Sequence, residues 1–260
     1  GYFIDIPCED KISNDIYNSR IGVKYFPFDH AFFIKGNIGK THRAPLFSEL
    51  FGERGFIIGN PYLKHETSIN RDIGFGISQR KQILFFDWID FEYAFFHNTT
   101  RDIIIFLQNS QLTMKAQNLD KARIMGHEFK LTMSIYDHLL LSCNYTLQEA
   151  IDKSGIPYYE NNYLPHRPRN EASFRAKIFD KYLSLIYELS YTGVNFRDRA
   201  NSEFYYLERR ILHNLNLQLF PVSWIAVSLE VKNISDNRTK DIIGYPLPGR
   251  SYYATISSKF

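Results

Sequence analysis

Side chains that could carry covalent chemistry are plentiful in this sequence, but their spacing forms no catalytic motif. His-Glu occurs at His65-Glu66 and at His127-Glu128, and neither pair is followed by the second histidine of a His-Glu-x-x-His zinc site. The sequence contains no Gly-x-Ser-x-Gly elbow and no Gly-x-Gly-x-x-Gly loop. Cys8 and Cys143 lie in unlike contexts, which favours neither a disulfide nor a metal site. We therefore expect no catalytic residue, no metal ligand and no cofactor.

Binding chemistry is better represented than catalysis. Arginine and aromatic side chains in loops suit an anionic ligand, because the guanidinium group pairs with anions and aromatic rings add stacking and cation–π contacts. The loop residues of this kind that we select as candidates are Arg54, Phe56, Tyr158, Tyr159 and Tyr163.

The candidate residues lie between runs in which apolar and polar residues alternate. Near the end of the chain, 223–231 and 252–260 both alternate with a period of two. Such a period predicts β-strands with one apolar and one polar face. Similar runs recur from residue 16 onward, and they predict about eleven strands.

The connections between these runs alternate strictly between short and long. Short turns are predicted near 27–30, 80–82, 136–138, 179–181 and 220–222, and long loops near 42–65, 98–111, 152–166, 197–203 and 235–249. Short periplasmic turns at one rim and long extracellular loops at the other are typical of an outer-membrane barrel. The predicted fold class is therefore an all-β, antiparallel transmembrane β-barrel.

Composition agrees with this fold class and excludes others. The 260 residues include 22 Phe and 18 Tyr, and aromatic girdles are one cause of such a content. No run of about 18 apolar residues is present, so a spanning helix is excluded. The net charge of +3 and the absence of a compact basic–aromatic motif argue against nucleic acid. A soluble sandwich or propeller is the alternative, but its strands are typically about 5–6 residues long.

Five stretches of the sequence carry a family resemblance. They are 41–52 (Thr-His-Arg-Ala-Pro-Leu-Phe-Ser-Glu-Leu-Phe-Gly), 59–66 (Gly-Asn-Pro-Tyr-Leu-Lys-His-Glu), 122–128 with Ile-Met-Gly-His-Glu, 165–170 with Pro-His-Arg-Pro-Arg-Asn, and 231–250 followed by the terminal Phe260. In this order the chain resembles the TonB-dependent outer-membrane receptors. Each box is weak alone, but the five together cover nearly the entire chain.

The resemblance implies a particular place within the receptor. The family barrel has 22 strands and a plugged lumen, so about eleven strands correspond to its C-terminal half. We expect 1–15 to be the remnant of an extracellular loop, 16–260 to be barrel, and Phe260 to be the assembly signal. The plug, the TonB box and the early strands are not in this sequence. The loop residues that match the family boxes are Arg43, Ala44, Pro45, Glu49, Asn60 and Pro61, and we expect them to fix the shape of the loop.

The polar faces of the predicted strands are expected to line the lumen of the barrel. They carry mixed charge, at Lys35, Asn37, Asp90, Glu92, Lys130, Arg175, Lys177, Glu188 and Glu230. Such a lining suits either a plug held by hydrogen bonds and salt bridges or a water-filled channel, and the sequence does not separate the two.

The resemblance also implies a function. It predicts a receptor in the bacterial outer membrane that imports a metal chelate or a vitamin, with an iron–siderophore first, then cobalamin and heme. No histidine occurs from Arg43 to Lys64, which disfavours heme. The implied partners are the TonB–ExbB–ExbD energising complex, outer-membrane lipid and the barrel-assembly machinery. A passive porin and a surface adhesin are the alternatives from other classes.

Overall fold

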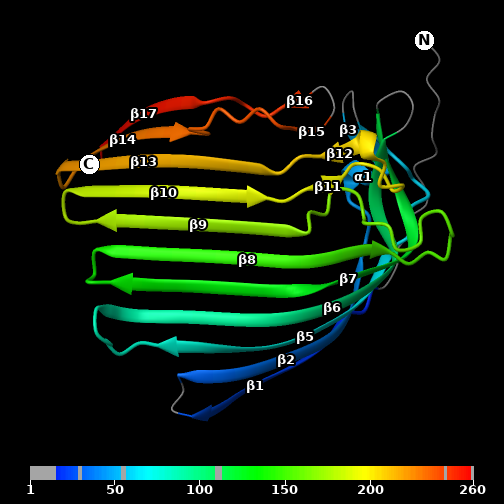
Figure 1. The fold of residues 1–260 in the computed structure, drawn as a ribbon, viewed down its shortest axis with the longest axis horizontal. Coiled ribbons are helices and arrows are strands. Elements are labelled where there is room, and N and C mark those ends of the chain that lie inside the picture. Colours follow the sequence, from blue (N-terminus) through cyan, green and yellow to red (C-terminus); the bar gives the residue numbers. More distant parts are fainter. Residues whose placement is uncertain (1–15, 29–30, 54–56, 109–112, 243–244, 259–260) are drawn as a thin grey trace.

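The computed structural model describes residues 16–28, 31–53, 57–108, 113–242 and 245–258. Most of these residues belong to one antiparallel sheet in which each long strand lies beside the next along the chain (Figure 1). The long strands are β1 (Ser19–Phe28), β2 (Phe32–Arg43), β5 (Glu66–Gln79), β6 (Phe86–Gln108), β7 (Met114–Ile135), β8 (Leu139–Asp152), β9 (Asn170–Phe179), β10 (Leu183–Thr192), β13 (Arg210–Val222), β14 (Ile225–Lys232) and β17 (Ser251–Ser258).

Short elements occupy the long connections, which gather at one end of the sheet while the tight hairpins gather at the other (Figure 1). They are α1 (Phe47–Phe51), β3 (Gly52–Glu53), β4 (Ile57–Ile58), β11 (Asn195–Phe196), the 3₁₀ turn η1 (Glu203–Tyr205), β12 (Tyr206–Leu207), β15 (Lys240–Ile242) and β16 (Tyr245–Pro246). Within the described part of the chain, no helix has the length and apolar character needed to cross a membrane.

The two faces of the sheet differ because side chains alternate along each strand. On β5, Ile73 is 60% exposed and belongs to the apolar outer face, whereas Gly74 and Gly76 on the inner face are buried. The inner face carries polar side chains such as Asn37 and Asp72, which are cross-strand neighbours. Apolar side chains therefore face outward toward lipid and polar ones face inward, as in a membrane barrel.

The predicted fold class is confirmed. Eleven long strands follow one another in the sheet, and β3 and β4 pair outside this path. Over the described residues the sheet does not close on itself, as expected for one part of a barrel. The predicted extracellular remnant, 1–15, and the assembly signal, Phe260, both lie outside the described residues.

One predicted loop, 98–111, is wrong. β6 continues without interruption to Gln108, and β7 begins at Met114. The polar run from Asn98 to Asp102 stays in the sheet because it pairs on both sides, for example Thr100 with Ser68 and with Ala122. Polar residues on both faces of this stretch remove the apolar alternation by which strands are recognised. The turn predicted at 220–222 also lies later, at Ser223-Trp224.

A close approach between strands explains the glycine of one family box. The Cβ of a larger residue at Gly126 would lie 2.2 Å from the carbonyl oxygen of Leu147 and 3.0 Å from the ring of Phe96. Phe96 and Gly126 are also direct cross-strand partners. The ring of Phe96 therefore covers the space that a side chain at this position would fill.

Replacing Gly126 by alanine is expected to destabilise the barrel. The new methyl group meets backbone atoms that cannot move without disturbing the sheet, and such overpacking costs about 1–3 kcal/mol. The measurement is the urea midpoint of unfolding in lipid vesicles. Gly36→Ala is the matched control, because its nearest contact would be an ordinary 3.7 Å from the carbonyl oxygen of Asp72. Equal midpoints for the two variants would contradict the close approach.

Candidate ligand-binding site

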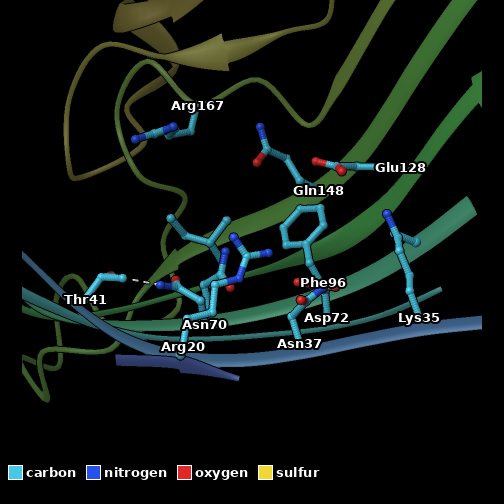
Figure 2. A pocket seen from close by; sticks show the side chains of 14 residues that line it. Arg20, Lys35, Asn37, Thr41, Asn70, Asp72, Phe96, Glu128, Gln148 and Arg167 are labelled. Carbon is cyan, nitrogen blue, oxygen red and sulfur yellow. Dashed lines mark hydrogen bonds between the residues drawn. The ribbon is translucent and has the colours of Figure 1, made fainter. Parts of the chain in front are cut away.

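The inner face of the sheet is hollowed toward the end that carries the long loops. The hollow has a volume of about 560 Å³, and β1, β2, β5, β6, β7, β8 and the connection after β8 contribute to it. Its polar lining is formed by Arg20, Lys35, Asn37, Thr41, Asn70, Asp72, Asn98, Glu128, Gln148 and Arg167, with the ring of Phe96 among them. Figure 2 shows Arg167 on its loop, apart from Arg20, Asn37 and Asp72 on the sheet.

The charged groups of this hollow have few partners. Asp72 accepts a hydrogen bond of 2.7 Å from the side-chain amide of Asn37, and Lys35 forms an ion pair with Glu92. Among the described residues, neither Arg20 nor Arg167 has an ion-pair partner. The carboxylates of Asp72 and Glu128, which also line the hollow, likewise have no ion-pair partner among the described residues. The two guanidinium groups therefore offer N–H donors to the oxygen atoms of a ligand within a hollow of mixed charge.

The loop between β2 and β5 is tied to the sheet by a forked ion pair. Nε and Nη2 of Arg43 donate to the two carboxylate oxygens of Glu66 at 2.8 and 2.7 Å, and Nη1 donates to Glu49 at 3.0 Å. Glu49 is 4% exposed and also accepts a hydrogen bond from the backbone N–H of Leu46 at the start of α1. Arg43 therefore joins the two family boxes, because Glu49 belongs to the first and Glu66 to the second.

The second box holds the loop against β7. The side-chain amide of Asn60 donates to the carbonyl of Ala116 at 2.9 Å, and its backbone N–H donates to the carbonyl of Glu49 at 2.8 Å. Asn118 and Lys64 exchange two hydrogen bonds through the backbone of Lys64. The remaining predicted motif residues are Ala44 and Pro61, which are exposed, and Pro45, which is half-buried.

Helix α1 presents aromatic rings that sequence reasoning missed. Phe47 and Phe51 are 76% and 65% exposed, and their ring centroids are 4.7 Å apart. Residues four apart lie on the same side of a helix, so this spacing could have predicted the aromatic pair from the sequence. Tyr62, on the same loop, is 90% exposed.

The three tyrosines predicted to contact ligand have different surroundings. Tyr158 is 72% exposed. Tyr159 lies beneath the guanidinium of Arg199, 4.3 Å from ring centroid to Cζ, and Tyr163 stacks on Phe196 with centroids 6.3 Å apart. Tyr159 and Tyr163 thus pack within the loops, whereas Tyr158 remains available to contact a ligand. The other two predicted loop residues, Arg54 and Phe56, lie outside the described residues.

The connections after β8 and after β10 are joined into one body. Nε of Arg199 lies 2.5 Å from a carboxylate oxygen of Asp152, a side chain with no solvent exposure. Asn201 accepts a hydrogen bond from the backbone N–H of Tyr163 and donates to its carbonyl, at 2.6 and 2.8 Å. This body, 152–169 with 193–209, includes Arg167 and so positions one wall of the hollow.

The closing family box is built around Asn233. Its side chain is buried, donates to the carbonyls of Asn237 and Pro248, and accepts from the backbone N–H of Asn237. Asp236 in turn accepts a hydrogen bond of 2.8 Å from the backbone N–H of Arg250. That bond, with the nearby Arg238 guanidinium, holds the pKa of the Asp236 carboxyl below its usual value. The motif residues of this loop therefore set its conformation.

Comparison with protein families assigns the chain to one family. The family model described as TonB dependent receptor-like, beta-barrel matches residues 9–234. The chain therefore belongs to the TonB-dependent receptor family, whose members are outer-membrane β-barrel transporters and not enzymes.

Solved structures show the same fold. The copper transporter OprC has a TM-score of 0.70 at 16% identity, with 94% of this chain and 39% of that chain covered. A mutant of the ferric enterobactin receptor PfeA from Pseudomonas aeruginosa has a TM-score of 0.69 at 18% identity, with 94% and 40% covered. The siderophore receptor PirA from Acinetobacter baumannii has a TM-score of 0.66 at 18% identity, with 94% and 41% covered. This chain thus spans about two fifths of each, and a comparison with curated proteins found no match.

Replacing Arg43 by lysine is expected to loosen the loop 44–65. Lysine keeps the charge but cannot bridge two carboxylates as a planar fork does. We expect added protease to cut this loop about tenfold faster, which corresponds to about 1.4 kcal/mol of lost protection. Arg80→Lys is the control, since Arg80 pairs with Asp90 near the opposite rim and is 63% exposed. Unchanged cleavage in Arg43→Lys would show that the fork does not hold the loop.

Replacing Arg199 by alanine is expected to release both loops of the body 152–169 with 193–209. The Asp152 carboxylate would be left buried without its cation, and breaking a buried pair costs about 3–5 kcal/mol. Amide hydrogen exchange should accelerate in both segments together. Arg175→Ala should change little, because Arg175 and Glu188 are about half exposed and such pairs contribute about 0–1 kcal/mol. Acceleration in only one segment would refute a single body.

Proposed function

We propose that this chain forms part of the wall and mouth of an outer-membrane receptor that imports an anionic metal chelate, in the first place an iron–siderophore complex. The TonB–ExbB–ExbD complex supplies the energy, and ligand is captured from the extracellular side. Family membership supports the class of transporter, and the residues of the hollow support the class of ligand.

The observation that carries this proposal is the pair of free arginines in the hollow. Arg20 approaches from β1 and Arg167 from the loop after β8, and the aromatic ring of Phe96 lies in the same lining. Siderophore complexes that carry negative charge and planar groups match guanidinium and ring contacts. The volume of about 560 Å³ is within the range of small-molecule sites.

The loops add support because ion pairs hold them in an ordered conformation. The Arg43 fork fixes α1, and the Asp152–Arg199 pair fixes the loop that bears Arg167. Preorganised binding surfaces lose less entropy when a ligand binds. The exposed rings of Phe47, Phe51 and Tyr158 are thereby held ready as further contacts.

Uptake by cells that carry the receptor tests the proposal. Iron-loaded catecholate and hydroxamate siderophores, cobalamin and heme are offered in turn, with and without functional TonB. We expect saturable, TonB-dependent uptake of an anionic ferric siderophore. Energy-independent passage of many small solutes would indicate a porin, and attachment without uptake would indicate an adhesin.

A paired variant tests the position of the site. Changing both Arg20 and Arg167 to glutamine should weaken binding of the accepted siderophore by at least about tenfold, because each charge-assisted hydrogen bond contributes about 1.5–3 kcal/mol. The control pair is Lys81→Gln with Lys181→Gln, which removes the same charge from the short turns. Equal binding by the two pairs would move the site away from this hollow.

A further inference from the structure

The outer face of the sheet carries a group of cations close to its apolar belt. On β5 the outward positions from the short-turn end are Ile77, Phe75 and Ile73, and the next is Arg71. Arg71 shares the exposed face of these residues, whereas its neighbours Asn70 and Asp72 line the hollow inside. Outward alternation likewise places Lys40 on this face, opposite Ile69.

Strand register brings three more cations onto the same face. Arg101 on β6 lies directly opposite Lys121 on β7, and Arg123 follows two residues further along β7. We call Lys40, Arg71, Arg101, Lys121 and Arg123 the outer basic patch. Its strands β2, β5, β6 and β7 lie side by side in Figure 1.

Most of the patch is uncompensated by acidic side chains among the described residues. Arg123 pairs with Glu149 at 2.8 Å, and the side chains of the other four cations have no ion-pair partner among the described residues. Like charges directly opposite each other destabilise a sheet, and Arg101 and Lys121 are such a pair. An external anion would remove this repulsion.

The patch lies on the loop side of an aromatic row on the outer face. A row of rings on the outer face contains Phe75, Tyr93, Phe129 and Tyr145, whose successive centroids are 5.4, 5.0 and 6.2 Å apart. Aromatic girdles mark the membrane–water interface. The patch begins four residues beyond Phe75 on the side of the long loops, so it faces the extracellular headgroups.

The cations are confined to one sector of the wall. Within the described bounds of β8, β9, β10, β13, β14 and β17, the outward positions hold no Lys or Arg; on β10, for example, they are Leu183, Leu185, Tyr187, Leu189 and Tyr191. A general attraction to an anionic surface would not require such confinement.

The patch also divides into two cation pairs. Lys40 and Arg71 are diagonal neighbours on β2 and β5, about 7–8 Å apart. Arg101 and Lys121 form the second pair, and Arg101 lies opposite Thr67, four residues along β5 from Arg71. At about 3.4 Å per residue the two pairs are about 14 Å apart.

From this arrangement we propose that the outer basic patch binds a lipid of the extracellular leaflet whose headgroup carries two phosphate groups. One phosphate is held by Lys40 and Arg71 and the other by Arg101 and Lys121, with the acyl chains against the apolar belt. The site is separate from the imported ligand, because the patch faces away from the hollow.

Lipid binding by the purified receptor tests this site. The receptor is mixed with detergent micelles that contain either bisphosphorylated lipid A or phosphatidylglycerol at equal total charge, and bound lipid is counted by native mass spectrometry. We expect tighter binding of lipid A by about tenfold or more. The triple variant Arg71→Gln, Arg101→Gln, Lys121→Gln should lose this preference, since each basic residue contributes about fivefold to anionic lipid binding.

The control removes three cations at the short-turn rim, by Arg80→Gln, Lys81→Gln and Lys181→Gln, and should keep the preference. Heat-modifiable mobility in gels establishes that each variant is folded, and single variants at the exposed Arg71 or Lys121 replace the triple one if it is not. Equal binding of the two lipids by the unmodified receptor, or an unchanged preference in the folded patch variants, would overturn the proposal. Siderophore uptake, measured in parallel, is expected to persist and so separates this result from the test of transport.

Discussion

Backbone hydrogen bonding in hydrocarbon is the constraint on which this structure depends. Inside a bilayer no water can pair with a free N–H or C=O, so each strand must be bonded on both sides. The chain meets this requirement by placing every long strand next to the one that follows it. Among the described residues, the outer edges of β1 and β17 lack a partner, and in a membrane such edges must be paired.

Once the strands are paired, the family boxes have a shared physical role. Arg43 binds carboxylates from both early boxes, Gly126 leaves room for Phe96, and Asn233 organises the closing loop. Arg43 and Asn233 keep long loops folded at one end of the sheet, and Gly126 allows close packing within the sheet itself. Residues that recognise ligand need not coincide with them, which is why the motifs identify the family but not the substrate.

The sequence could predict strands whose apolar and polar residues alternate. It could not predict contacts between side chains that lie far apart in the chain. The run from Leu139 to Leu147 was predictable because one side faces lipid and the other faces the lumen. Asn98 to Asp102 was misread because polar residues occupy both faces of the strand there, so the apolar alternation is lost. The fork at Arg43 spans 23 residues to Glu66, and the packing of Tyr163 on Phe196 spans 33, so neither contact leaves a local pattern.

For the proposed import of a ligand, the two-loop body has a consequence for the rate of capture. Because the side chain of Asn201 bonds to both the backbone N–H and the carbonyl of Tyr163, the two loops are joined to each other without a ligand. Capture should then resemble docking into a rigid funnel, with arrival limited by diffusion and orientation and not by loop closure.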